Sequence, residues 1–367
     1  MKRIIFILLV VVTASLLTAA GTTDKTAGRT AVLKEVLRIG DEGGDFYLKQ
    51  PTRIKTAPDG SIFIMDDEQF LRFDKNGRFI NNQQKKGEGP GEYLSLFDFT
   101  FLDNKIVLYS NQPAKIIETD ITGTLLKEYR LERRMGFIRI LNIDGDGYWL
   151  AQAGFEDIAK KNSGPFTLTL EISRGAYDGK TEKTGITFPE KWYMLKESSS
   201  KGVRMALISL SRSVFTMDGS STLFASTSQP YGIQRVDLEN KKVTGIIKRD
   251  YNSVPYSEKE PEEGEKENER SRPKDSIPDF FSDVQYILIH NDHLWVLTST
   301  VEKDKGVLVD VFTKDGKYTD HFYLPLPQVE TANDLERKPM FLDGDCLFTV
   351  ESDEDENPVV VKYKIET

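Results

Sequence analysis

The sequence predicts an all-β fold in which small sheets are arranged in a ring, and three observations support this prediction. Apolar strand runs alternate with Gly, Asp and Asn turns along most of the chain. A β-hairpin pattern recurs six times, with first turns at about positions 59, 103, 146, 218, 291 and 343. No segment has the composition of a linker between two domains. This combination is typical of a six-bladed β-propeller with four antiparallel strands per blade.

The first copy of the repeat, Thr52 to Ile80, shows the pattern most clearly. Two turns, Pro58-Asp59-Gly60 and Asn76-Gly77, separate runs rich in Ile and Phe. Turns of this kind between apolar runs indicate consecutive antiparallel strands. The later copies carry equivalent pairs of turns at Asp103-Asn104 and Thr122-Gly123, at Asp146-Gly147 and Asp178-Gly179, at Asp218-Gly219 and Glu239-Asn240, and at Asn291-Asp292 and Asp315-Gly316.

The spacing of the copies predicts two insertions. Successive first turns are 44 and 43 residues apart at first, but 72 and 73 residues apart in the next two intervals. We therefore expect one domain over 31–367, with insertions at about 188–211 and 251–282.

The last copy, Lys338 to Thr367, contains only three strands. The segment Ala31 to Gly40 precedes the first copy and has no other strand to pair with. We expect it to supply the fourth strand, because this closes the ring and removes the free sheet edges that promote aggregation.

The amino-terminal residues have the pattern of a secretory signal peptide. Lys2 and Arg3 precede an apolar run, Ile4 to Leu17, and small residues follow it, which predicts a signal peptide over 1–20 with cleavage after Ala20. The run of 14 residues is shorter than the ~20 that a membrane span needs. We expect an exported monomer, periplasmic or extracellular, with no membrane span after cleavage.

Charge and cysteine content narrow the function classes. The net charge of −9 argues against nucleic acid as a partner, because such binding requires a basic face. The single cysteine, Cys346, cannot form an intrachain disulfide. The acidic stretch 257–276 has almost no apolar residue, so we expect a loop that is dispensable for folding.

Turn chemistry also predicts which face of the ring carries the binding site. The tight turns all fall on one face by strand alternation, and the long connections all fall on the other. Long loops on a rigid scaffold usually carry binding sites, so we expect a site on the loop-rich face around the central channel. Candidate binding residues there are Asp66, Asp67, Glu92, Tyr93, Asn111, Arg133, Arg134, Trp192, Tyr193, Arg212 and Tyr231.

Motifs for metals are incomplete. The segments NIDGDG (142–147) and DEDEN (353–357) place oxygen ligands at alternate positions as a calcium loop does, but neither has the required later Glu. His290 and His293 flank a hairpin turn without an evident third zinc ligand. We therefore predict no cofactor, with Ca²⁺ as the one candidate.

Three motifs in the first 131 residues resemble a known family. They are Asp59 to Asp66, Leu71 to Phe79 and Gly87 to Tyr93. Together they are similar to the secreted six-bladed β-propeller proteins related to NHL repeats, many of them from Bacteroides-like bacteria. The resemblance implies the fold and an exported protein, and it supplies no catalytic residue.

Two functions fit these observations. The first is a non-enzymatic binding or scaffold propeller for a protein, peptide or glycan, which the lack of catalytic motifs such as G-x-S-x-G favours. The alternative is a metal-assisted, calcium-type hydrolase or lyase with its site at the channel mouth.

Overall fold

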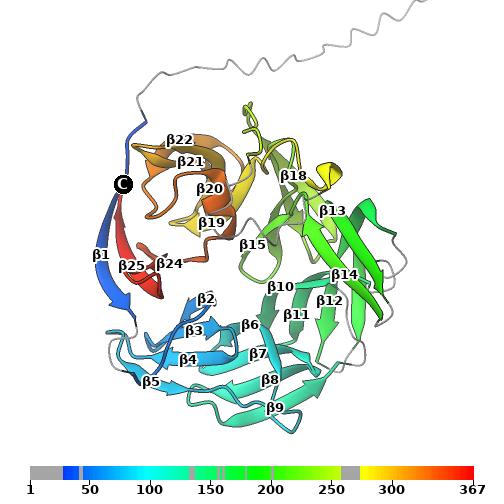
Figure 1. Cartoon of the computed structure of the whole chain (residues 1–367), viewed down its shortest axis with the longest axis vertical. Helices are drawn as coiled ribbons and strands as arrows, with labels where there is room; N and C mark the ends of the chain where they lie inside the picture. Colours follow the sequence, from blue (N-terminus) through cyan, green and yellow to red (C-terminus); the bar gives the residue numbers. More distant parts are fainter. Residues whose placement is uncertain are drawn as a thin grey trace, which may run out of the picture.

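The computed structural model describes residues 28–40, 44–131, 137–154, 158, 162–177, 180–199, 202–257 and 273–367. These residues form antiparallel sheets that surround a common axis, one sheet per blade (Figure 1). The predicted six-bladed β-propeller is confirmed. The predicted signal peptide, residues 1–20, lies outside the described residues.

In blades 1 to 5 the strands follow one another in chain order from the axis outward, and in blade 6 the amino-terminal strand β1 is the outermost. Blade 1 contains β2 (Pro51–Thr56), β3 (Ile62–Asp66), β4 (Gln69–Phe73) and β5 (Phe79–Asn82). Blade 2 contains β6 (Ser95–Leu102), β7 (Lys105–Gln112), β8 (Ala114–Asp120) and β9 (Leu125–Arg130). Blade 3 contains β10 (Phe137–Asp144), β11 (Gly147–Ala153), β12 (Gly164–Ala176), β13 (Thr181–Ser199) and β14 (Gly202–Ser209). Blade 4 contains β15 (Val214–Asp218), β16 (Thr222–Ser226), β17 (Gly232–Asp237) and β18 (Lys242–Lys248). Blade 5 contains β19 (Val284–His290), β20 (His293–Glu302), β21 (Gly306–Thr313) and β22 (Tyr318–Leu324). Blade 6 contains β23 (Met340–Asp343), β24 (Cys346–Ser352), β25 (Pro358–Glu366) and β1 (Val32–Ile39).

Blade 6 is built from both ends of the described chain. Strand β1 pairs antiparallel with β25, from Val32 opposite Glu366 to Ile39 opposite Val360. The two strands lie side by side at the edge of the ring in Figure 1. Closure of the ring by the amino-terminal strand, predicted from the missing strand of the last copy, is confirmed.

The hydrophobic core is divided into clusters that lie between neighbouring blades. Phe348 of blade 6 packs with Ile39 of β1 and with Ile54 and Phe73 of blade 1. Equivalent clusters join blades 1 and 2, 2 and 3, 3 and 4, 4 and 5, and 5 and 6. Because burial of apolar area is the main favourable term in folding, each blade depends on both of its neighbours.

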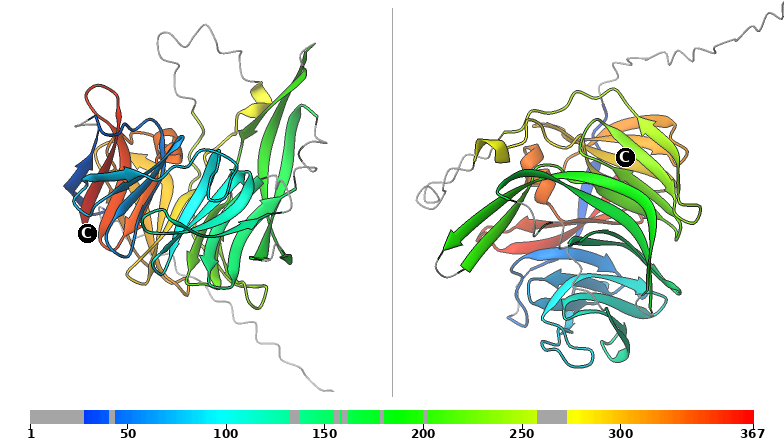
Figure 2. Two further views of the ribbon diagram at one scale, coloured as in Figure 1. Left: turned by 90° about the horizontal axis from the view of Figure 1, so that it is seen from below. Right: turned by 90° about the vertical axis from the view of Figure 1, so that its right-hand side faces the viewer.

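The insertion expected at 188–211 is regular strand rather than loop. Strand β13 continues past the body of blade 3, and β14 returns beside it from Gly202 opposite Ser199 to Ser209 opposite Trp192. Blade 3 therefore has a fifth strand, and this hairpin projects from one face of the ring (Figure 2). Charged and aromatic residues interrupt the apolar alternation of this segment, so its sequence indicated an insertion without indicating strands.

The second insertion, between β18 and β19, is partly described. Residues Pro255 and Phe280 form an isolated antiparallel bridge, and the 3₁₀ helix η2 (Lys274–Ser276) packs against β12 and β13. Ser276 is fully buried, so the carboxyl end of the predicted 257–276 loop is packed, while 258–272 lie outside the described residues.

A short helix, α2 (Ala332–Arg337), lies in the connection between blades 5 and 6. The carboxylate of Asp334 accepts hydrogen bonds from the backbone N–H (2.9 Å) and hydroxyl (2.8 Å) of Thr331 and so fixes the start of this helix. Among the described residues, no helix has the length and apolar character needed to cross a membrane.

The ring closure predicts how truncation affects folding. A chain that begins at residue 41 lacks β1 and leaves β25 as an unpaired edge, whereas a chain that begins at residue 28 retains β1. We expect the shorter chain to lose its cooperative transition or to melt at a Tm lower by roughly 10 °C or more, and the longer chain to melt as the mature protein does. Circular dichroism melting measures both, and equal Tm values would contradict the closure argument.

Residues 258–272 should be dispensable for stability. Replacement by a Gly/Ser linker of equal length should shift the Tm by less than about 2 °C, because the acidic stretch has almost no apolar residue to bury and the length of the loop is unchanged. As a control, extending the replacement to 276 removes buried Ser276 and should lower the Tm further. A large loss from the shorter replacement would show that 258–272 pack against the propeller.

Candidate functional site

A cavity runs along the axis of the ring between the innermost strands of the blades. Its volume is about 830 Å³, and residues of β2, β6, β10, β15, β19 and β23 line it. Side chains that are far apart in the sequence therefore share one cavity. Such a pre-formed cavity at the centre of a rigid scaffold is the usual position of a ligand site.

The charges that line this channel differ from those of the whole chain. Its cationic residues are Arg53 and Lys55 of blade 1, Arg139 of blade 3 and Arg212, which precedes blade 4. The anionic residues that line it are Asp98 and Glu336. The channel is thus rich in cations although the chain carries a net charge of −9.

Arg139 is held in place by a buried carboxylate. Its guanidinium lies 3.0 Å from the carboxylate of Glu190 and donates a 2.6 Å hydrogen bond to the carbonyl of Ser213. Glu190 is fully buried, and it also accepts hydrogen bonds from the backbone N–H of Ser213 (2.6 Å) and the indole N–H of Trp192 (3.1 Å). This network joins β10, β13 and the start of blade 4.

Electrostatic effects show that the arginines enclose the same space. Burial lowers the pKa of Arg139, and the positive charges of Arg212 and Arg53 lower it further, while Glu190 opposes the change. Burial raises the pKa of Tyr286 on β19 to about 12, against the opposing effect of Arg212 and Arg53. Arg53, Arg139, Arg212 and Tyr286, from blades 1, 3 and 5 and from the start of blade 4, line the same channel, and we call the part that they line the channel mouth.

Blade 1 contributes two cations that share one carboxylate. Lys55 Nζ lies 3.1 Å from Asp98 Oδ1, and Arg53 Nε lies 3.8 Å from the same atom. The Lys55 ammonium also donates to the carbonyl of Phe99. The side chain of Arg53 remains 47% exposed, so it is available to a ligand.

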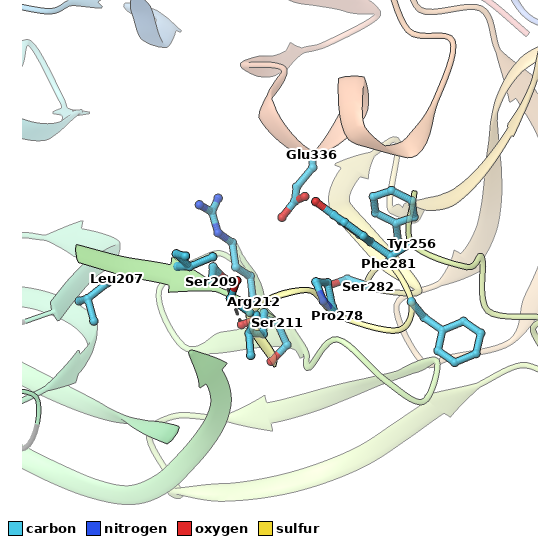
Figure 3. Close-up of a pocket in the computed structure, with 13 residues that line it drawn as sticks. Leu207, Ser209, Ser211, Arg212, Tyr256, Pro278, Phe281, Ser282 and Glu336 are labelled. Atoms are coloured by element: carbon cyan, nitrogen blue, oxygen red, sulfur yellow. Dashed lines mark hydrogen bonds between the residues drawn. The ribbon is translucent and has the colours of Figure 1, made fainter. Parts of the chain in front are cut away.

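A side pocket opens next to the channel mouth. Its volume is about 200 Å³, and it shares Arg212, Ser282 and Glu336 with the channel lining. Figure 3 shows Arg212 and Glu336 projecting into this space from opposite sides, with Tyr256 beside Glu336. The end of β14 forms another wall.

The walls of the side pocket are fixed by local contacts. The backbone N–H of Tyr256 donates to Asp279, and that of Phe281 donates to Val254, both at 3.0 Å. The rings of Tyr256 and Phe281 lie 4.7 Å apart between centroids. The hydroxyl of Tyr286, which lines the channel, donates a 2.7 Å hydrogen bond to the carbonyl of Lys338 and so anchors the end of α2, the helix that carries Glu336.

Of the candidate residues named from the sequence, Arg212 lines both cavities. The indole of Trp192 is buried and donates a hydrogen bond to Glu190, which holds the channel residue Arg139. Tyr193 is buried in β13. Tyr231 is buried and donates a 3.0 Å hydrogen bond to Asp310. Whether any of these residues binds a ligand stays a prediction.

The candidate residues of blades 1 and 2 make structural contacts within the chain. Asp66 is buried and accepts from the backbone N–H groups of Lys49 (2.9 Å) and Gln50, while Asp67 forms a 2.6 Å ion pair with Lys49. Burial raises the pKa of Asp66. Glu92 accepts a hydrogen bond from Gly89, and Tyr93 packs in the core between blades 1 and 2. The candidates Arg133 and Arg134 lie outside the described residues, as does the side chain of Asn111.

Sequence reasoning missed Arg53, Arg139, Glu190 and Glu336. A signal did exist for two of them, because Arg53 and Arg139 each occupy the third position of the first strand of a blade. Glu190 and Glu336 gave no such signal, because Glu190 lies in the insertion of blade 3 and Glu336 in the connection between blades 5 and 6, and neither segment belongs to the repeat.

The segments considered for metals have other contacts. His290 Nδ1 lies 3.0 Å from the carbonyl of Gly344, and His293 Nδ1 lies 2.8 Å from the carbonyl of Asn291. Asp144 pairs with Arg174, and Asp353 accepts hydrogen bonds from its own turn. In the part of the chain that the structure describes, no group of three or more His, Cys, Asp or Glu residues is arranged to hold a metal ion.

Comparison with known proteins identifies the family. The sequence pattern of a family described as 6-bladed beta-propeller (DUF5128) matches residues 43–254. The chain belongs to this family. The family expected from the three motifs is thus confirmed. A search of curated proteins finds no match.

Several solved structures resemble this chain at low sequence identity and with low TM-scores. A "Putative exported protein" of Bacteroides fragilis is 15% identical, with 94% of this chain and 98% of that chain covered and a TM-score of 0.48. A protein of unknown function from Bacteroides caccae is 12% identical, with 78% and 88% covered and a TM-score of 0.40. A gluconolactonase from Xanthomonas campestris is 14% identical, with 92% and 97% covered and a TM-score of 0.42.

The buried ion pair at the channel mouth can be tested by stability. Glu190→Gln removes the negative charge that faces Arg139 in a buried setting, so we expect a loss of about 3 kcal/mol in the free energy of unfolding. As a matched control in the same blade, Glu171→Gln breaks the exposed pair with Lys183 and should cost less than about 0.5 kcal/mol. Urea denaturation measures both, and equal losses would show that the Glu190 network does not hold Arg139.

Proposed function

We propose that this protein is an exported, monomeric and non-enzymatic binding propeller that holds its ligand at the channel mouth on the loop-rich face. The observation that carries the proposal is the continuity of the 830 Å³ channel with the side pocket through Arg212, Ser282 and Glu336. The ligand is a protein, a peptide or a glycan.

The types of side chain at the channel mouth support recognition. Arginine and tyrosine are enriched in binding sites because they offer several hydrogen bonds together with a large planar surface. Arg53 of blade 1, Arg212 of the connection before blade 4 and Tyr286 of blade 5 provide these groups. Phe280 adds an aromatic side chain that is 43% exposed. A rigid ring that fixes such groups reduces the entropy lost on binding.

Export is supported by the pattern of the first residues. Lys2 and Arg3 before the apolar run Ile4 to Leu17 match a secretory signal peptide. The proposal therefore places the ligand outside the cytoplasm, in the periplasm or beyond the cell.

A substitution at the channel mouth tests the proposal. We expect Arg212→Ala to weaken binding of a ligand found by screening glycan arrays and peptide libraries by about tenfold or more, because a charge-assisted contact is lost. Arg78→Ala, an exposed arginine in the β4–β5 turn on the opposite face, is the control and should bind as the unmodified protein does. Binding is measured by calorimetry.

Two results would replace the proposal. Equal affinity of both variants for the ligand would place its site elsewhere on the propeller. One bound metal per chain after purification without chelator, with saturable stabilisation by Ca²⁺, would favour the metal-assisted hydrolase or lyase instead.

A further inference from the structure

Strand β14 presents a free edge beside the channel mouth. It is the last strand of the blade 3 sheet and pairs with β13 on one side only. Among the described residues, no backbone hydrogen bond reaches its other side. An edge strand has unpaired N–H and C=O groups at alternate residues and can accept another strand.

The side chains of this edge strand are unusually apolar for an exposed position. Met205 and Leu207 are 46% and 36% exposed, and they share one face because they are two residues apart. Natural edge strands are usually protected by charges, prolines or bulges. None of these protections interrupts residues 205–209, which read Met-Ala-Leu-Ile-Ser.

The free edge leads directly to the cationic channel mouth. Strand β14 ends at Ser209, Leu207 to Arg212 line the side pocket, and Phe280 lines the same pocket. The channel has four cations among its lining residues, Arg53, Lys55, Arg139 and Arg212. The three carboxylates around them are those of Asp98, Glu190 and Glu336. One positive charge is therefore left for a ligand to neutralise.

We propose that the β14 edge and Arg212 together bind an extended peptide that carries a carboxylate. This inference deepens the proposed function and rests on it. The backbone of the peptide pairs with β14, alternate apolar side chains cover Met205 and Leu207, and the carboxylate lies at Arg212. Addition of a strand to an exposed edge is a recurring mode of peptide recognition.

The direction of β14 specifies the order of residues in the peptide. Antiparallel pairing is the more stable arrangement, and every strand pair in the described sheets is antiparallel. Because β14 runs toward Arg212, an antiparallel peptide runs away from it. The acidic residue must then precede the apolar residues in the peptide sequence.

Strand β14 offers groups that would contact a peptide but that a glycan does not need. Backbone pairing groups and aliphatic side chains such as Met205 and Leu207 suit an extended polypeptide, whereas an acidic sugar would need only the arginines. The two ligand classes therefore depend on different residues and can be separated by substitution.

The test uses the mature protein and a synthetic peptide with blocked ends, in which two Asp residues precede alternating Val and Thr. We expect this peptide to bind, and to lose about tenfold in affinity when its Asp residues are replaced by Asn. A peptide with the same residues in reversed order should bind no more tightly than the Asn peptide. N-methylation of one of the two sets of alternate backbone N–H groups should abolish binding, because only one set faces β14. Fluorescence anisotropy measures each affinity.

Protein variants complete the test. Leu207→Glu and Arg212→Gln should each lower the affinity for the acidic peptide by about tenfold or more. Leu126→Glu, at a 51% exposed leucine on the edge strand β9 of blade 2, is the matched control and should bind normally. Circular dichroism melting confirms that each variant folds.

Two outcomes overturn the inference. If the Asp and Asn peptides bind equally and N-methylation has no effect, then neither the charge nor the edge is used. If no peptide binds but trigalacturonic acid binds with dependence on Arg212 and not on Leu207, then the ligand is an acidic glycan. That second result would leave the proposed binding site at the channel mouth intact.

Discussion

The pairing of β1 with β25 is the constraint on which the rest of this structure depends. A propeller has no central core, and its apolar residues are buried between neighbouring blades. Every blade therefore needs two neighbours, and blade 6 lacks a complete sheet unless the amino-terminal strand joins it. Closure converts six marginal sheets into a ring in which each interface supports the next.

The same closure creates the channel. The innermost strands β2, β6, β10, β15, β19 and β23 surround one cavity because the ring is complete. Arg53 and Arg139 are brought together in this way although blade 2 lies between them in the sequence. Charges of the same sign are tolerated there because Asp98 and Glu190 hold individual cations, and because part of the channel remains open to water.

The fold could be predicted from the sequence, because turn chemistry and strand alternation are local properties that recur with the repeat. The missing strand of the last copy even identified the strand that closes the ring. The hairpin of β13 and β14 could not be predicted in this way, since residues such as Glu190 and Trp192 interrupt the apolar alternation and occur in one blade only. The sequence therefore predicted an insertion here but not its strands.

The candidate site was predicted less completely than the fold. The loop-rich face and Arg212 followed from turn positions and residue types, but exposure cannot be inferred from residue type alone. Asp66, Tyr93 and Tyr231 are polar or aromatic residues that suit a binding surface, yet the structure buries all three. Arg53 and Glu336 became candidates only when the channel brought them together.

Hydrogen exchange with and without the acidic peptide tests the central claim most directly, namely that the closed ring forms a binding site at the channel mouth. The account predicts slower amide exchange at 202–212 and in the adjoining 280–286 segment when the peptide is bound, with the tight-turn face unchanged. Slower exchange confined to the turns at Gly60, Gly77 and Gly316, or no change at 202–212 under saturating peptide, would contradict it.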